Sequence, residues 1–304
     1  MELIMKNMFQ SLGKSRTANR LAKKYGLRFG AARFVAGETI QQSIAAVRGL
    51  NQDGRVATLD HLGEFVFSED EALESAAMCI QTLDAIAESG VKSNLSLKMT
   101  SLGLDISREL CVTSMKRILD RARLHNNFVR IDMEDYAHCQ ISLDIYRELR
   151  KDYDNVGIVI QAYLFRTMQD IDDLASLGAN LRLVKGAYKE SPQVAFPDKS
   201  AVDENYKKII EKHLTNGHYT AIASHDEAII KHTKQFVSEH GISNDQFEFQ
   251  MLYGICDELQ KQLVREGYRV RIYVPYGVDW FGYFMRRLAE RPANVWFVLK
   301  NMFK

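Results

Sequence analysis

Three cationic side chains stand inside apolar segments of this 304-residue sequence. Lys98 lies in the run SLKM, and Arg182 and Lys185 both lie in LRLVKG. A charged side chain in such a run is seldom buried unless it is paired, and a buried guanidinium needs an anion or several hydrogen-bond acceptors. We therefore expect all three residues to serve a functional site, with Arg182 facing a group that is negative or becomes negative.

A second group of cations lies near the carboxyl terminus, in the segment DWFGYFMRRLAERP. On a helix Arg286 and Glu290 share one face, because they are four residues apart, and Arg287 lies about 100° round the axis. The aromatic residues around the arginines favour a packed position over the alternative, an exposed basic helix end. Two planar guanidinium groups suit bidentate binding of a small carboxylate.

The elements that hold these residues follow a βα rhythm. From residue 56 onward, short runs rich in Val, Ile and Leu alternate with longer amphipathic stretches, at intervals of about 30 residues. The eight runs are VATLDHL, NLSLKM, FVRIDM, VGIVIQAY, NLRLVKG, YTAIAS, FEFQML and RVRIYV. This repeat predicts an α/β fold of the (βα)8 TIM-barrel type.

In such a barrel the active site lies at the carboxyl ends of the strands. Polar residues end almost every predicted strand, which a purely structural barrel does not need. They are Asp60, Glu64, Lys98, Asp132, Glu134, Gln161, Lys185, Tyr188, His225, Asp226, Gln250 and Tyr273. Some of them have structural roles, and Asp226 is expected to cap the helix that follows it. A capping box of Ser68 and Glu71 predicts the start of an earlier helix.

The first 54 residues are predicted to form a helical arm, with residues 55–304 as the barrel domain. Basic residues in the arm alternate with Leu and Ala, which is typical of a solvated helix face. Residues 291–304 are predicted to form one more amphipathic helix.

Composition excludes several other functions. Lys and Arg total 40 against 39 Asp and Glu, so a net charge of +1 gives no field for binding nucleic acid. No apolar run approaches the ~18 residues that span a bilayer. The four cysteines are scattered and no metal-ligand spacing occurs, so we expect reduced thiols, no metal site and a cytoplasmic protein. There is no GxGxxG motif for a Rossmann dinucleotide site, and the histidines are interpreted as mostly surface residues.

The strand ends resemble the proline dehydrogenase family. The resemblance covers the barrel to residue 294, is most similar to short monofunctional bacterial enzymes, and is most specific in LRLVKGAY and YxxRRLxE. The other matching segments are SLKMTSLGLD, VRIDMED, VIQAYLFRT, ASHDE, FEFQMLYG and RIYVPYGVDWFGYFMRRLAERPAN.

This resemblance implies a distorted barrel that holds FAD above the strand ends. Lys98, Arg286 and Arg287 match residues that bind the proline carboxylate, Tyr188 and Tyr273 match aromatic residues that wall the ring, and Glu290 matches the acid of the arginine cluster. Asp132 and Arg182 match active-site participants. The flavin-binding positions match Met133, Gln161, Arg182, Val184, Lys185, Gly186, Ala187, Ser224, His225 and Gln250.

The reaction implied is oxidation of L-proline to 1-pyrroline-5-carboxylate, the first step of proline catabolism to glutamate. A hydride passes from the ring carbon next to nitrogen to N5 of FAD, and the electrons then pass to a quinone or another acceptor. A quinone acceptor would require peripheral contact with the inner face of the membrane, and the product would pass to a separate pyrroline-5-carboxylate dehydrogenase. The alternative is an aldolase-type lyase in which Lys185 or Lys98 forms a Schiff base.

Overall fold

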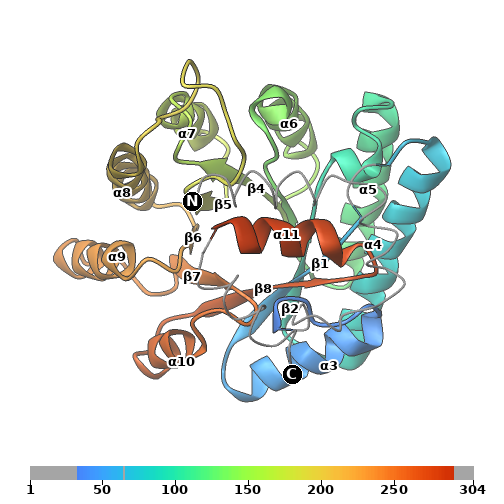
Figure 1. Cartoon of the computed structure of the whole chain (residues 1–304), viewed down its shortest axis with the longest axis horizontal. Helices are drawn as coiled ribbons and strands as arrows, with labels where there is room; N and C mark the ends of the chain where they lie inside the picture. The colour runs from blue at the N-terminus through green and yellow to red at the C-terminus, as the bar shows by residue number, and fades with distance from the viewer. Residues whose placement is uncertain (1–32, 64–65, 291–304) are drawn as a thin grey trace.

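Eight parallel strands close into a barrel in the order of the sequence (Figure 1). The computed structural model describes residues 33–63 and 66–290, with side chains described as far as residue 285. The strands are β1 (Val56–His61), β2 (Ser93–Leu97), β3 (Val129–Ile131), β4 (Val156–Gln161), β5 (Leu181–Val184), β6 (Thr220–Ala223), β7 (Phe247–Leu252) and β8 (Val270–Tyr276). Each strand coincides with one predicted run, so the predicted fold class is confirmed. The helical stretches expected before residue 33 and over 291–304 lie outside the described residues.

The helices form a ring around the barrel, with one exception. They are α3 (Ile40–Gln52), α4 (Glu69–Ser89), α5 (Arg108–Leu124), α6 (Tyr136–Leu149), α7 (Thr167–Ala175), α8 (Lys199–Thr215), α9 (Glu227–Glu239), α10 (Asp257–Arg265) and α11 (Trp280–Glu290), with a short 3-10 turn, η3 (Thr100–Leu102). Helix α3 lies between α10 and α4 and packs on β1 and β8. It fills the place in the ring that the helix after β8 would ordinarily take.

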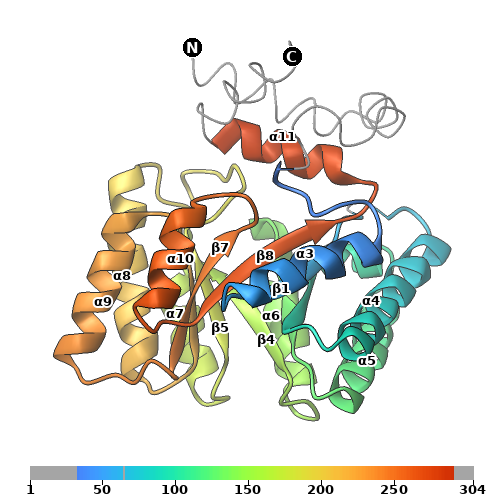
Figure 2. The same cartoon turned by 90° about the horizontal axis from the view of Figure 1, so that it is seen from below.

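Helix α11 instead crosses the carboxyl end of the barrel (Figure 2). Its aromatic residues Trp280, Tyr283 and Phe284 are buried in a cluster with Phe34 and Val35. The rings of Phe34 and Phe284 lie 6.1 Å apart. Burial of this apolar surface holds α11 over the strand ends. This position of α11, outside the ring of helices, is how the structure departs from a regular (βα)8 barrel.

The segment before α3 is joined to the end of β8 by backbone hydrogen bonds. The amide of Ala36 donates to the carbonyl of Pro275 at 2.9 Å, and the amide of Gly277 donates to the carbonyl of Gly37 at 2.9 Å. Residues more than 200 positions apart are thereby fixed side by side, directly beside the start of α11.

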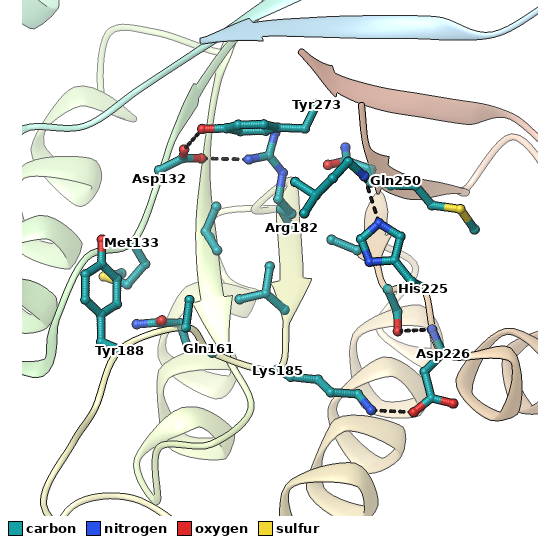
Figure 3. A pocket seen from close by; sticks show the side chains of 18 of the residues that line it. Asp132, Met133, Gln161, Arg182, Lys185, Tyr188, His225, Asp226, Gln250 and Tyr273 are labelled. Atoms are coloured by element: carbon teal, nitrogen blue, oxygen red, sulfur yellow. Dashed lines mark hydrogen bonds and ion pairs between the residues drawn. The ribbon is translucent and has the colours of Figure 1, made fainter. Parts of the chain in front are cut away.

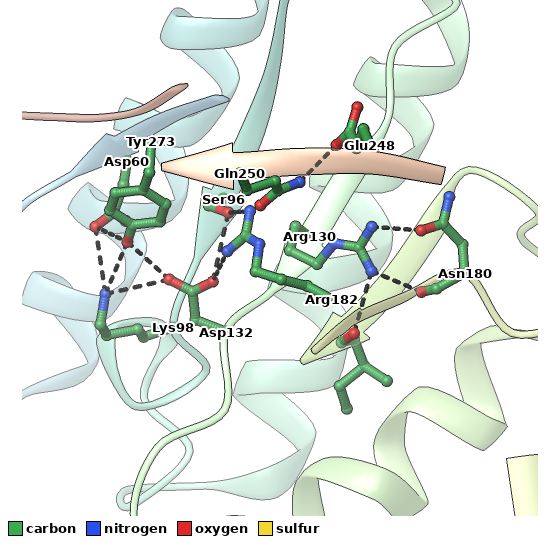
Figure 4. A network of polar contacts seen from close by, with 11 residues as sticks. Asp60, Ser96, Lys98, Arg130, Asp132, Asn180, Arg182, Glu248, Gln250 and Tyr273 are labelled. Carbon is green, nitrogen blue, oxygen red and sulfur yellow. Dashed lines mark hydrogen bonds and ion pairs between the residues drawn. The ribbon is translucent and has the colours of Figure 1, made fainter. Parts of the chain in front are cut away.

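Polar and charged side chains occupy the interior of the barrel, deeper than the carboxyl ends of the strands (Figure 4). Arg271 Nε donates to Glu248 at 2.7 Å, and Arg130 donates to the carbonyls of Ile158 at 3.1 Å and Asn180 at 2.6 Å. Burial alone would raise the pKa of Glu248, but Arg271 lowers it overall. Alternate strand residues point inward, so these charges replace the branched aliphatic layers usual in such barrels.

The capping box predicted at Ser68 is only half formed. Ser68 Oγ accepts from the Glu71 amide at 3.2 Å, as expected, but the Glu71 carboxylate accepts from the amide of Phe67 at 2.7 Å. A complete box occurs at Thr39 and Gln42, at the start of α3. The local sequence therefore marks where the helix begins but does not fix the second partner.

The sequence interpretation was right for the cysteines and wrong for one histidine. All four cysteines are free, and Cys79, Cys111 and Cys139 are buried. His213, interpreted as a surface residue, is only 1% exposed on α8. Burial lowers its pKa to about 4, so this imidazole is neutral in the folded protein.

Candidate active site

A cavity of about 500 Å³ opens at the carboxyl ends of the strands (Figure 3). This volume lies within the range of about 300–1,000 Å³ that is usual for cofactor and ligand sites. Tyr283 of α11 contributes to its lining. The lining includes the predicted site residues Lys98, Asp132, Met133, Gln161, Arg182, Val184, Lys185, Gly186, Ala187, Tyr188, Ser224, His225, Gln250 and Tyr273.

Three predicted site residues cannot be placed in the same way. Arg286, Arg287 and Glu290 belong to α11, which crosses this end of the barrel, but their side chains lie outside the described residues. Glu64, which the sequence puts at the end of β1, also lies outside them.

A network of four polar side chains forms one end of the cavity (Figure 4). The hydroxyl oxygen of Tyr273, on β8, lies 2.6 Å from Asp60 Oδ2 and 2.7 Å from Asp132 Oδ2. Lys98 Nζ lies 3.3 Å from Asp60 Oδ2 and 3.5 Å from Asp132 Oδ2. Burial, with the adjacent Asp132 and Asp60, raises the pKa of Tyr273 well above its usual value, so the phenol keeps its proton. From the sequence, Asp60 is predicted to lie at the end of a strand, but no function is assigned to it.

Arg182 joins this network from β5. Its guanidinium donates to Asp132 Oδ1 at 2.6 Å and to Ser96 Oγ at 3.0 Å, and it lies 5.4 Å from the centre of the Tyr273 ring. Its Nε is buried and has no hydrogen-bond partner among the described side chains and backbone. A buried donor without a partner costs about 1–3 kcal/mol, so this end of the cavity can accept a ligand with a hydrogen-bond acceptor.

At the opposite side Lys185 links two helices. Its Nζ lies 2.5 Å from Asp203 on α8 and 2.6 Å from Asp226 at the start of α9. Hydrogen bonding from Lys185 lowers the pKa of Asp226. Asp226 also caps α9 as predicted, since it accepts from the Ala228 amide at 3.0 Å. The sequence missed Asp203, because it lies within an ordinary charged helix and only the fold brings it to Lys185.

Three further polar residues of the lining, Gln161, His225 and Gln250, are held by backbone or side-chain groups. Gln161 donates to the carbonyl of Glu134 at 2.8 Å. His225 Nε2 accepts from the amide of Leu252 at 2.9 Å, which puts the proton of the neutral ring on Nδ1. Gln250 donates to Glu248 at 2.6 Å. These contacts fix the side chains before any ligand is bound.

The loop after β5 is fixed against the loop after β4. The amide of Phe196 donates to the carbonyl of Tyr163 at 2.8 Å, and Leu164 forms an antiparallel bridge with Ala195. Gly186, with φ of 117°, packs on the Tyr163 ring. These contacts hold the part of the loop that carries Ala187 and Tyr188 over the cavity.

The arrangement offers little support for a lyase that uses a Schiff base. Such a lysine must lose its proton to attack a carbonyl group. Lys98 and Lys185 each lie within 3.5 Å of two carboxyl groups, so neither amino group is positioned away from acidic partners as a nucleophile.

Comparison with known families decides the relationship. The family model described as proline dehydrogenase matches residues 43–300. The chain belongs to the proline dehydrogenase family. Proline dehydrogenase 2 of Bacillus subtilis (strain 168) is 55% identical to it over 302 residues, covering 99% of this chain and 100% of the relative. The proline dehydrogenase of Deinococcus radiodurans is 46% identical over 279 residues, covering 90% of each chain.

Solved structures of proline utilization A share the fold. The crystal structure of proline utilization A from Bdellovibrio bacteriovorus, inactivated by N-propargylglycine, has a TM-score of 0.80 and 28% sequence identity. The match covers 86% of this proline dehydrogenase family member but only 32% of the solved chain. Our chain therefore corresponds to about a third of that longer protein.

Proposed function

We propose that this chain oxidises L-proline to 1-pyrroline-5-carboxylate with bound FAD, as the first step of proline catabolism to glutamate. The observation that carries the proposal is the joining of Lys98, Asp132, Arg182 and Tyr273 in one buried network at the end of a cofactor-sized cavity. Membership of the proline dehydrogenase family supplies the substrate class.

The residues of the cavity fit a flavin. Arg182 has a buried donor in need of an acceptor, and Gln161, Lys185 and His225 supply further polar groups around a cavity with apolar walls. An isoalloxazine ring is flat and apolar on its faces and carries hydrogen-bonding atoms along its edges, which matches this lining. The residues proposed to hold FAD are Met133, Gln161, Arg182, Val184, Lys185, Gly186, Ala187, Ser224, His225 and Gln250. When bound there, FAD supplies at N5 the acceptor for the hydride from the ring carbon next to nitrogen.

We propose that charged residues bind the carboxylate end of the substrate and that apolar surfaces contact its ring. Proline is a zwitterion, so its carboxylate needs cations and its three methylenes need an apolar wall. Lys98 is one cation, and Arg286 and Arg287 on α11, with Glu290 beside them, are proposed as the others. Tyr188 and Tyr273 are proposed to wall the ring.

Asp132 and Arg182 are proposed to stabilise charge and to assist proton transfer during the reaction. Asp132 lies between Lys98 and Arg182, so its carboxylate orients both cations. Arg182 keeps a permanent positive charge in a buried position, which stabilises the electron density that builds up beside it during oxidation. This charge is in place before the reaction, so no reorganisation is needed.

The electrons are proposed to leave to a quinone or another acceptor, with the product passing to a separate pyrroline-5-carboxylate dehydrogenase. Among the helices described, none is both long and apolar enough to cross a bilayer. We therefore propose that a quinone would be reached through peripheral contact with the inner face of the membrane, from the cytoplasm. We also propose a division into an arm of residues 1–54 and a barrel domain of residues 55–304, in which α3 of the arm packs on β1 and β8 of the barrel.

An anaerobic absorption experiment tests the activity. The purified chain, loaded with FAD, should show flavin absorption bands that disappear when L-proline is added without air. A yellow sample that keeps its colour with proline would contradict the proposal. Borohydride trapping of a carbonyl substrate on Lys98 or Lys185 would instead support a lyase.

A further inference from the structure

Asp60 is a buried carboxyl group to which the family resemblance and the proposed reaction assign no role. It ends β1 and is only 2% exposed. Its Oδ2 lies 2.6 Å from the Tyr273 hydroxyl and 3.3 Å from Lys98 Nζ. It therefore shares both partners with Asp132, which approaches them from β3.

The number of protons in this contact is fixed by chemistry. A phenol carries one proton and donates one hydrogen bond. The Tyr273 oxygen nevertheless lies within hydrogen-bonding distance of two carboxyl oxygens, on Asp60 and Asp132. Each short contact between oxygens requires a hydrogen between them. The phenol supplies one, so the second must come from one of the two carboxyl groups.

We propose that Asp60 and Asp132 share one proton through the Tyr273 hydroxyl, and that this proton tunes the site for binding an anion. The pair then carries one negative charge instead of two. With Lys98 and Arg182 both positive, the four groups have a net charge of +1 rather than zero. This surplus favours a ligand with a carboxylate, and the inference rests on the proposed function because proline is such a ligand.

Other groups near Asp60 keep their charge state near neutral pH. The thiol of Cys79 and the phenol of Tyr276 are the further titratable groups that Asp60 influences among the described side chains. Burial, with a smaller contribution from Asp60, raises the pKa of Cys79 to about 12 and that of Tyr276 above its usual value. Burial and the nearby Arg182 lower the pKa of Arg130 to about 9, so the measurements are kept below that pH. A change in anion binding near neutral pH therefore has three possible sources, the shared proton, Lys98 and the imidazole of His225 in the cavity lining, and the Asp60 and Asp132 variants separate the first from the others.

The test is the pH dependence of binding of cyclopentanecarboxylate to the FAD-loaded chain. This probe has the ring size and carboxylate of proline but no amine, so the ligand itself does not titrate between about pH 6 and about pH 9. We expect the affinity of the wild-type chain to fall as pH rises, by up to about tenfold per pH unit, the slope of one linked proton. In Asp60→Asn, and equally in Asp132→Asn, one carboxyl group is gone, so the decline should disappear.

A matched control is Asp120→Asn. Asp120 also accepts a hydrogen bond from a tyrosine, at 3.0 Å from the Tyr153 hydroxyl, but this pair is not part of the cavity lining. The control should keep the wild-type pH profile. Any change that it shared with Asp60→Asn would point to a general effect of losing an Asp–Tyr contact and would overturn the proposal.

Three further outcomes would overturn it. The first is a flat profile in the wild-type chain, and the second is an unchanged decline in Asp60→Asn. The third is a decline that moves to lower pH in Asp60→Asn, because Lys98 would then be the titrating group, weakened by the loss of a carboxylate. If Asp60→Asn does not fold, the wild-type profile and Asp132→Asn decide. The proposed oxidation fails separately, if proline does not bleach the flavin.

Discussion

The backbone of Gly186 lies against the ring of Tyr163 so closely that a Cβ at residue 186 would be 2.3 Å from a ring carbon. The loop between β5 and α8 thereby packs without a gap on the loop after β4. The same glycine has φ of 117°, a backbone conformation that other residues adopt only with strain.

Gly186→Ala should therefore destabilise the loop. Overpacking of this kind costs about 1–3 kcal/mol, and the strained φ adds to it. We expect a lower melting temperature and weaker retention of FAD, measured by thermal unfolding and by the flavin content after gel filtration. Gly178→Ala is the control, since Gly178 also has positive φ, 56°, but no atom lies within 4 Å of its Cβ position. Equal losses in both variants would show that the contact with Tyr163 has no effect.

Arg182→Lys should slow flavin reduction by proline while changing proline affinity little. Lysine keeps the charge but cannot bind Asp132 and Ser96 at the same time with one planar group. We expect a decrease of about 100-fold, similar to the loss of one preorganised donor in other active sites. Anaerobic stopped-flow absorption measures the rate. Arg166→Lys, which alters a pair with Asp170 outside the cavity lining, should leave the rate unchanged.

Arg286→Ala and Arg287→Ala should each weaken proline binding. If both guanidinium groups bind the carboxylate, each loss costs roughly 2–4 kcal/mol, or about 30-fold to 1,000-fold in affinity. Steady-state kinetics should show this as a raised KM for proline. An unchanged KM in both single variants would refute their assignment to the carboxylate.

Lys185→Met should reduce stability at neutral pH and flatten its acid dependence. Burial alone would raise the pKa of Asp203, but hydrogen bonds from Lys185 and Lys199 lower it overall, and Lys185 lowers the pKa of Asp226. Carboxylates with lowered pKa stabilise the folded state above the unfolded pKa of about 3.9, and this stability is lost as pH falls through the folded value.

Urea unfolding of the chain without FAD, at neutral pH and at pH values below about 4, measures this effect. The wild-type free energy of unfolding should fall more steeply towards acid pH than that of Lys185→Met. The control is Lys207→Met, which breaks a pair with Glu204, an exposed residue, and should change little. Parallel acid profiles for the wild type and Lys185→Met would show that the pair does not stabilise the fold.

Much of the fold could be predicted because each strand is a short apolar run between amphipathic stretches. The order of parallel strands then brings their carboxyl ends together, and this is why Lys98, Asp132 and Arg182 could be named together from the sequence. The position of Asp60 at the end of a strand did not reveal its role, since a carboxylate after a strand can also cap the following helix.

Other features could not be predicted for physical reasons. Arg130, Glu248 and Arg271 alternate with apolar residues, a pattern that fits a solvated strand face as well as a polar barrel interior. The amphipathic patterns of α3 and α11 require an apolar partner but do not say which one. Only the assembled barrel shows that α3 takes a place in the ring and that α11 crosses the end.

The packing of Phe34 and Val35 against α11 makes the segment before α3 a support for the helix that contributes Tyr283 to the cavity lining. A protease that cut between this segment and α3 would leave every strand intact, yet it would remove one side of the support for the helix that carries Arg286 and Arg287. Such a cut should change the rates of ligand exchange more than it changes the melting temperature of the barrel. Fusion tags at this end should be compared with carboxyl-terminal ones for the same reason.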